Sequence, residues 1–456
     1  MRRTIFLGVV SWTAFCVAFI AMGLFSPVAL AVPAFARKTG LACSSCHEVW
    51  PRLNDFGQLF RDRGYRLQRD RDAPVQQDGS YWPIAMRTTV GYQWLRQTLV
   101  PTDAGPVTTQ TGTFGFTGLD VFAAGTLGDS VSFLITYTPG LGSAGFQTAP
   151  STGGDLESAF LGIHDIAGTP YVNVRVGKHA PDLPVDEHRT ITLTQGYNVF
   201  HYHPAGTAVT WEPGANQNGI ELYGHSDLSR FRYSFSLVNE NDATLFSSTA
   251  LSNPVLWGHV QGTHYLDNPI LAAVKLGAFG SVGWHSSSVL TMTTPAPAGS
   301  APGTPDSVSP VPGTGSNHKT HFRYGGEGHL YLFSIVNPLT LTAVLWGGQD
   351  DQALIGGGVR NATFLGGFLE GVWTITPRAS LIGRFEVIHP TQGVDPAAGP
   401  VPGNVKWWTA AFRHTFELTS RTEAALHLEF SRASSDAGDG TFPTAHAVLA
   451  GFDIAL

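Results

Sequence analysis

From residue 84 onward, the chain alternates between apolar and polar side chains with a period of two. In residues 229–239, Phe231, Tyr233, Phe235 and Leu237 share one face, and four Arg or Ser residues share the other. Successive side chains of a β-strand point to opposite faces, so this period predicts strands with one apolar face. Soluble β-sandwiches alternate in the same way. The alternation therefore predicts an all-β fold and leaves a sandwich or a barrel open.

The lengths of the connections favour a membrane barrel. Seven short turns, near residues 128, 168, 227, 268, 337, 376 and 419, alternate with long connections rich in Gly, Pro and Ser. Outer-membrane barrels have short periplasmic turns and long outer loops in this order. Seven hairpins and one strand at each end predict a transmembrane β-barrel of about 16 strands over residues 81–456. Within it, residues 294–313 predict an irregular low-complexity loop.

The composition excludes several other classes of protein. Charged residues make up 13% of the chain, against about 25% in typical soluble domains. No stretch after residue 31 approaches the ~18–20 apolar residues of a membrane helix. The formal net charge of −7 argues against a nucleic-acid partner. We therefore expect a location in the bacterial outer membrane, with its lipid as a partner.

Residues 1–31 have the pattern of a secretory signal peptide. Arg2 and Arg3 precede a long apolar stretch, and Ala29-Leu30-Ala31 offers a small-residue cleavage site. An uncleaved anchor helix is the alternative. Cleavage would remove Cys16, so the mature chain is expected to begin near Val32 and to keep two cysteines.

Those two cysteines lie in the sequence Cys43-Ser44-Ser45-Cys46-His47. In C-x-x-C-H, two thiols can form thioethers to the vinyl groups of one haem, and the histidine ligates its iron. A redox pair would be expected in a βαβ unit, and a zinc site would need further ligands. No other Cys or His occurs before His164. The motif therefore predicts one covalently attached haem c, with His47 as the metal ligand.

The motif lies in a short segment, residues 32–80, that we expect to be helical. Pro51 suits a first helical position, apolar residues recur from Leu53 at helical spacing, and Gly64 suits the end of the helix. About 40 residues is near the limit at which a chain can bury its own core. The barrel is therefore expected to cover the haem, with this segment as a candidate plug. The arginines at 61–71 form either a solvated face or partners for acidic groups.

A sixth ligand for the iron would have to come from the following domain or from its edge. Met86 is the nearest methionine, and a thioether ligand would raise the redox potential relative to bis-histidine ligation. An ordinary strand position is the alternative for Met86. Other candidates are polar side chains of the lumen or of a long loop that could fold inward: His179, His188, His201, His203, His321, His329 and His427.

The order of leader, haem motif, short helix and barrel resembles the fused monohaem cytochrome c–porin family, to which Fe(II)-oxidising outer-membrane cytochromes belong. The likeness lies in Phe35-Ala36-Arg37-Lys38-Thr39-Gly40, the haem motif, Pro51, Leu53, Phe56-Gly57, Phe60 and Gly64-Tyr65. The resemblance implies electron transfer across the outer membrane through a haem in or near the barrel.

Three functions remain open from the sequence. The first is an electron conduit between an extracellular donor or acceptor, such as Fe(II), and a periplasmic c-type cytochrome, with Fe(II):cytochrome c oxidoreductase activity as its sharper form. The second is a diffusion porin whose haem segment is a periplasmic docking cap. The third is a haem peroxidase, which would need a distal acid–base residue.

Overall fold

The computed structural model describes residues 34–67, 83–99, 107–139, 154–193, 196–204, 207–240, 254–286, 289–294, 307–312, 318–333, 338–355, 360–390, 403–419, 422–435 and 444–455. The predicted leader and the predicted cleavage site lie outside the described residues. In the described part of the chain, no helix has both the length and the apolar character needed to cross a bilayer.

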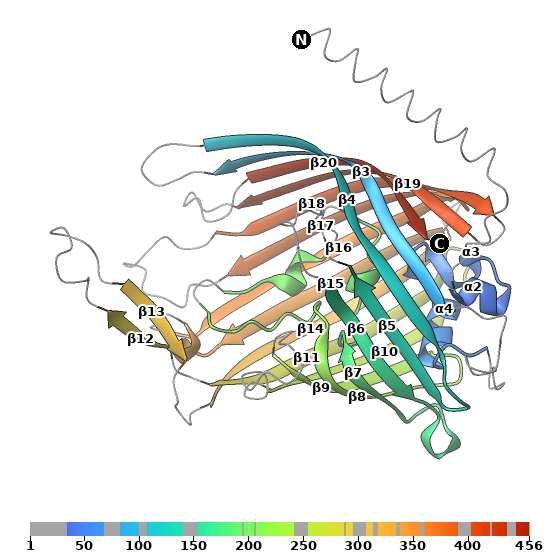
Figure 1. The fold of residues 1–456 in the computed structure, drawn as a ribbon, viewed down its shortest axis with the longest axis horizontal. Coiled ribbons are helices and arrows are strands. Elements are labelled where there is room, and N and C mark those ends of the chain that lie inside the picture. The colour runs from blue at the N-terminus through green and yellow to red at the C-terminus, as the bar shows by residue number, and fades with distance from the viewer. Residues whose placement is uncertain are drawn as a thin grey trace, which may run out of the picture.

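Sixteen antiparallel strands close into one barrel (Figure 1). Each strand pairs with the next barrel strand along the chain, and β3 (Ile84–Leu99) pairs with β20 (Thr444–Ala455) to close the ring. The strands between them are β4 (Val107–Thr126), β5 (Val131–Thr138), β6 (Asp155–Ile163), β7 (Asn173–His179), β8 (Gln217–His225), β9 (Phe231–Asn239), β10 (Pro254–Tyr265), β11 (Leu271–Ser286), β14 (His318–Phe333), β15 (Pro338–Asp350), β16 (Ala362–Thr376), β17 (Ala379–Pro390), β18 (Val405–Thr419) and β19 (Thr422–Ser435). The predicted fold class and strand number are confirmed.

The short connections lie where the sequence predicts them. Each of the seven predicted turns joins two consecutive barrel strands, so all seven lie at one end of the barrel. One long connection at the other end contains a separate two-stranded ladder of β12 (Val289–Thr294) and β13 (Ser307–Pro312). The prediction of an irregular loop over 294–313 is therefore wrong for β13, whose prolines are tolerated because it is an edge strand.

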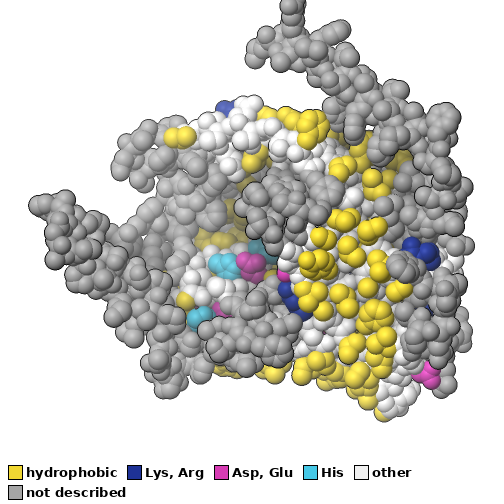
Figure 2. All heavy atoms as spheres, viewed as in Figure 1, with side chains coloured by type: hydrophobic (Ala, Val, Ile, Leu, Met, Phe, Trp, Pro, Cys, Tyr) yellow, Lys and Arg dark blue, Asp and Glu magenta, His cyan; other side chains and the backbone are white. Residues whose placement is uncertain are grey.

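An apolar belt covers the outside of the barrel (Figure 2). Leu345 is 69% exposed and Leu276 is 62% exposed, and both alternate along their strands with buried residues that face the lumen. A soluble protein would not leave so many large apolar side chains in water, whereas a lipid-facing belt of this kind is the rule in transmembrane barrels.

The lumen is filled by a long connection that folds inward. Residues 180–216, between β7 and β8, contain the short turns η2 (Glu187–Arg189) and η3 (Asn198–His201). We refer to them as the inward loop. Val199, Phe200 and Trp211 are at most 1% exposed, because they pack against aromatic side chains of the barrel wall. The loop and the wall thus form an apolar core inside the barrel.

The described N-terminal segment, residues 34–67, lies at the end of the barrel where the C-terminus lies (Figure 1). It contains α2 (Ala34–Thr39), α3 (Cys43–Cys46), β1 (His47–Val49), β2 (Arg52–Leu53) and α4 (Asp55–Asp62). Phe35, Phe60 and Tyr65 hold α2 against α4, with ring centroids 4.7–6.0 Å apart.

The main helix of this segment starts later than Pro51. Asn54 caps α4 by accepting a hydrogen bond from the Gly57 N–H at 2.9 Å, and Asn is among the preferred residues for this position. Pro51 lies instead in the turn between β1 and β2, after a cis peptide bond. Gly64 has a φ of +69° and follows the end of the helix, as predicted.

Candidate functional site

The two cysteines of the haem motif lie in a single turn of helix. Cys43 and Cys46 are the first and last residues of α3. Side chains three positions apart in a helix lie on the same face. The local fold therefore gives the two sulfurs the same direction, as attachment to one porphyrin edge requires.

Asn54 and Gly57 fix this turn against α4. The Asn54 N–H donates to the Cys46 carbonyl oxygen at 3.0 Å, and the Asn54 side-chain amide donates to the Ser45 carbonyl oxygen at 3.0 Å. A Cβ atom on Gly57 would lie 2.1 Å from the same Cys46 oxygen, so only glycine allows this approach. Sequence reasoning missed Asn54, although an Asn before a run of helical spacing is a known start of a helix.

His47 follows the turn in an extended conformation. Its Nδ1 lies 2.9 Å from the Pro51 carbonyl oxygen, which fixes the ring and favours a proton on Nδ1. Burial lowers the pKa of His47 to about 4, and the Arg189 guanidinium acts in the same direction. The imidazole is therefore neutral at pH 7, with Nε2 as the basic nitrogen, which is the form that ligates a metal.

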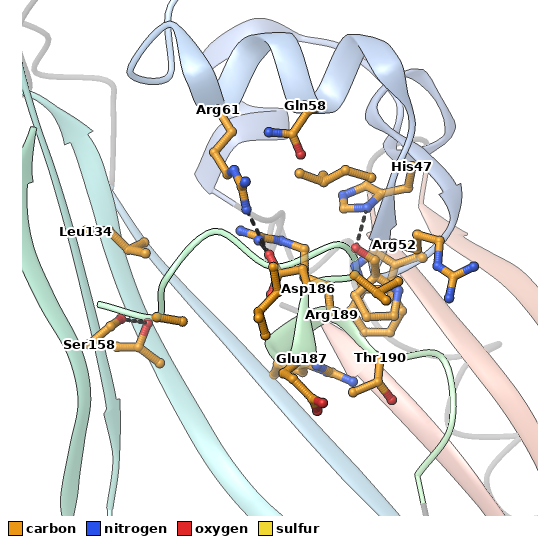
Figure 3. Close-up of a pocket in the computed structure, with 18 of the residues that line it drawn as sticks. His47, Arg52, Gln58, Arg61, Leu134, Ser158, Asp186, Glu187, Arg189 and Thr190 are labelled. Atoms are coloured by element: carbon orange, nitrogen blue, oxygen red, sulfur yellow. Dashed lines mark hydrogen bonds and ion pairs between the residues drawn. The ribbon is translucent and has the colours of Figure 1, made fainter. Parts of the chain in front are cut away.

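A cavity of about 1040 Å³ lies between the N-terminal segment and the inward loop (Figure 3). His47, Arg52 and Arg61 contribute from the segment, and Asp186 and Arg189 contribute from the loop. The volume is at the upper end of the roughly 300–1,000 Å³ range of ligand pockets. Neither thiol lines the cavity, so the cavity meets the haem motif at its histidine.

These features agree with the donor set of a haem c. Two thiols on one face and a neutral, oriented imidazole are the protein ligands that such a group requires. The cavity next to His47 offers room for a large group, and its arginines offer partners for carboxylates. Cys43, Cys46 and His47 would hold the group, which stays a prediction.

Ion pairs join the N-terminal segment to the barrel and to the inward loop. Asp62 accepts from the Arg232 Nε at 2.8 Å and from its Nη2 at 3.2 Å. Arg61 contacts Asp186 at 2.9 Å. Further pairs are Arg66 with Asp165, Arg52 with Glu370, Asp55 with Lys275 and Arg61 with Asp182. The arginines at 61 and 66 thus have acidic partners, and the alternative of a solvated face is wrong for them.

The structure places Met86 on β3, near the haem motif. It lines the same cavity as His47. It is also 37% exposed and alternates with Arg87 and Thr89, which pair with Asp453 of the lumen. Its strand position therefore has the parity of the outer face, and its role as the sixth ligand stays a prediction.

Two of the other candidate histidines line the cavity as well. His179 is 2% exposed, and its Nε2 has no hydrogen-bond partner among the described residues. Both ring nitrogens of His329 are occupied, by Thr342 and Glu327. The remaining candidates with described contacts outside the cavity are His201, His203, His321 and His427. Of the two candidates that line the cavity, His179 is thus the one with an unpaired ring nitrogen, which lies 3.9 Å from a Glu221 carboxylate oxygen.

Among the described residues, no group of three or more His, Cys, Asp or Glu side chains is arranged to hold a bare metal ion. Asp182 and Asp186 of the inward loop lie inside the barrel as partners of Arg61.

The closed barrel with its apolar outer belt decides the location of the molecule. The chain is a bacterial outer-membrane β-barrel. Only a closed barrel leaves no unpaired strand edge in the lipid, and barrels of this kind belong to that membrane.

Comparisons with known proteins add little to this assignment. No protein-family model and no curated protein sequence matches the chain. Solved structures with a similar fold include the anion-selective porin from Comamonas acidovorans (11% identity, 82% of this chain and 99% of that chain, TM-score 0.49). The outer membrane channel DcaP of Acinetobacter baumannii (11%, 86% and 99%, TM-score 0.49) and Pseudomonas putida OprB (11%, 90% and 99%, TM-score 0.49) are others. The barrel is assigned from its own strand pairing.

Proposed function

We propose that the chain carries one covalently attached haem c and passes single electrons across the outer membrane. The observation that carries the proposal is the position of the C-x-x-C-H turn: its histidine lines a cavity enclosed by the N-terminal segment and the inward loop. The inward loop narrows the lumen by packing an apolar core against one side of the wall. The space that remains lies beside His47, where a redox group would fit.

Each residue of the motif has a distinct role in this proposal. Cys43 and Cys46 form the thioether links, and His47 ligates the iron through Nε2, with its ring held by Pro51. The haem supplies an iron that accepts and returns one electron. Met86 and His179 are the two candidates for the opposite face, because both line the cavity.

The partners follow from the sidedness of the barrel. The N-terminal segment lies at the end with short turns, which is periplasmic in outer-membrane barrels. A periplasmic c-type cytochrome is therefore the expected partner at this end. At the other end, an extracellular donor or acceptor such as Fe(II) is expected, in agreement with the family resemblance.

Two measurements on purified protein test the proposal. The pyridine haemochrome spectrum of the wild type should report one covalent haem per chain, and Cys43→Ser with Cys46→Ser should abolish it while the barrel still forms. Stopped-flow mixing with Fe(II) under anaerobic conditions should then raise the haem α-band. A wild-type chain without haem would overturn the proposal, and a haem that dithionite reduces but Fe(II) does not would exclude Fe(II) as the donor.

A diffusion porin with a haem docking cap is the second candidate. The observation that favours it is the barrel itself, because sixteen closed strands are also the architecture of diffusion porins. The packed lumen separates the two candidates, and the conductance measurement that decides between them is given in the Discussion.

A further inference from the structure

Aromatic rings form a continuous chain through the lumen above the cavity. Barrel lumens are usually polar, yet ring follows ring here between the inward loop and the wall. Neighbouring centroids are 4.8 Å apart for Tyr197 and Phe368, 6.1 Å for Phe368 and Phe200, and 5.6 Å for Phe200 and Trp346. The chain continues through Phe364 to Tyr202, at 6.3 Å and 4.9 Å. We call these six rings the aromatic column: Tyr197, Phe368, Phe200, Trp346, Phe364 and Tyr202.

The column starts at the cavity. Arg52, which lines the cavity together with His47, donates a hydrogen bond to the Tyr197 hydroxyl at 2.7 Å. Tyr197 also donates to Glu370 of β16 at 3.1 Å. The lowest ring of the column is thus one side chain away from the haem-bearing segment.

The column ends near the extracellular rim. Phe364 is the third residue of β16, whose first residue is at the end with long connections. From Glu370, beside the lowest ring, to Phe364 is six residues, or about 20 Å of strand before its tilt is considered. The rings therefore cover much of the depth of the membrane.

Packing alone does not account for the indoles in this core. The indole N–H groups of Trp346 and of the neighbouring Trp211 are buried without a hydrogen-bond partner among the described residues. A buried polar group without a partner costs about 1–3 kcal/mol. Leu or Phe would fill such space without this cost, so packing alone does not explain the choice of an indole.

We propose that the aromatic column is the path along which electrons tunnel between the extracellular face and the haem. This inference rests on the proposed function and gives that function its route. Contacting π systems couple electronically better than saturated side chains or water-filled gaps do. One electron leaves the external donor, which is oxidised, and reduces haem Fe(III) to Fe(II); no bond forms or breaks.

The rings act in this route as a bridge and are not themselves oxidised. The Arg384 guanidinium lies 4.3 Å from the Tyr197 ring centroid, and that of Arg323 lies 5.2 Å from the Phe364 ring centroid. A cation over an aromatic face stabilises the electrons of the ring. Removal of an electron from either end of the column is therefore disfavoured.

Laser-flash photolysis of the full-length holoprotein tests the path directly. In a Cys16→Ser background, the remaining native cysteines are those of the haem motif, so Ala353→Cys provides one site for a ruthenium polypyridyl label. Ala353 is exposed beside the extracellular end of β15. Photoexcited ruthenium(II) gives one electron to haem Fe(III), and a sacrificial amine in solution then reduces the ruthenium(III) that remains.

Trp346→Leu should slow haem reduction from this label on the order of tenfold, equivalent to about 1.4 kcal/mol of barrier. Phe200→Leu should also slow haem reduction. Because Phe200 lies in the inward loop, this variant leaves every barrel strand unchanged and can be used if Trp346→Leu fails to fold. Trp346→Phe should largely keep the rate, because it keeps a ring. The matched control is Trp408→Leu, since Trp408 is 51% exposed on the outer face.

A second label position and a second readout separate the path from general damage. A label at Leu228→Cys, in the exposed turn between β8 and β9 at the periplasmic end, should give the same rate in all variants. The midpoint potential of the haem should also stay unchanged.

The column would be overturned as the path if the Ala353 label reduced the haem at the wild-type rate in both leucine variants. It would also be overturned if these variants slowed haem reduction equally from both label positions. In either case the proposed function stands. A wild-type chain that lacks covalent haem would reject the proposed function and the column together.

Discussion

Asp62 of α4 shows how single side chains hold the N-terminal segment in the barrel. Its side chain is 4% exposed and bonds both Nε and Nη2 of Arg232 on β9. A buried ion pair is weak evidence for net stability, but removal of one partner leaves an uncompensated charge. The position of the N-terminal segment in the barrel therefore depends on both partners of each buried ion pair being present.

We expect Asp62→Asn to loosen the segment without opening the barrel. The change removes one of the two carboxylates that pair with Arg232, while Asp182 stays at 3.1 Å. We therefore expect a cost below the value of about 3–5 kcal/mol for a buried charge that loses its only partner. Limited proteolysis should then cut within residues 34–67 faster than in the wild type. Asp267→Asn, at an exposed turn position, is the control and should change nothing; equal cleavage of both variants would contradict the role of the pair.

Acid should release the same segment. Burial raises the pKa of Asp62, but Arg232 and Arg61 outweigh this effect, so the pKa lies below its usual value. A carboxylate with a lowered folded pKa stabilises the folded state above its unfolded pKa, about 3.9, and this contribution is lost as the pH falls through the folded value.

The hydrogen-exchange rate of the α4 backbone amides, corrected for the intrinsic effect of pH, should therefore stay constant from pH 7 to about pH 5 and rise below about pH 4. A transition near pH 6.5 would contradict the role of Asp62.

Candidate residues can be identified from the sequence where chemistry sets the spacing, and the haem role of these residues stays a prediction. Cys43, Cys46 and His47 are defined by five consecutive positions. The partners of the arginines were not predictable, because Arg52 and Glu370 are 318 residues apart and nothing local links them. The parity of Met86 depends on the register between β3 and β20, which its own neighbours do not fix.

At the scale of elements, the approach of α4 to α3 shapes the haem motif. The helix rests on the Cys46 carbonyl through Gly57, and Asn54 bonds both elements. Sequence periodicity located this helix and its Gly64 end, but placed its start at Pro51 because the capping role of Asn54 was not considered. Cap residues act through side-chain hydrogen bonds, which hydrophobic periodicity does not report.

Gly57→Ala should lower the yield of covalent haem. Helix propensity alone predicts that alanine stabilises α4 by about 1 kcal/mol, so the expected loss has the opposite sign and reports the contact with Cys46. Haem-stained gels compared with immunoblots measure the yield. Gly383→Ala is the control, because nothing lies within 4 Å of a Cβ at that position; a normal yield from Gly57→Ala would show that α3 and α4 can separate freely.

At the scale of the whole molecule, the barrel could be predicted from the sequence, but the packing of the inward loop inside it could not. Six of the seven short turns contain Gly, Asn, Asp or Pro, which tight turns favour, and the seventh, Thr419-Ser420, contains none of them. The inward loop gave a weaker indication: its Val199, Phe200 and Trp211 are too apolar for a loop in water. Their partners on β10, β15 and β16 are set by closure of the ring, which no local pattern encodes.

The packed lumen predicts that the molecule does not conduct ions. In planar bilayers, the wild type should show no stable single-channel steps, because the inward loop occupies part of the lumen and the proposed haem would occupy the cavity beside it. A variant in which a short Gly-Ser linker replaces residues 183–211 should conduct, which confirms that the barrel has inserted. Steady conductance of the wild type would favour the diffusion porin.

The pairing of β3 with β20 also constrains the order in which the parts of the molecule assemble. The partners of the N-terminal segment are spread around the ring, in the turn after β6, on β9 and on β16. They reach their final places only when the last strand of the chain has joined the first. The earliest part of the mature chain is thus the last to be seated during biogenesis. A group attached to α3 would be loaded while this segment is still free, and closure would then commit that one copy to the molecule for its lifetime.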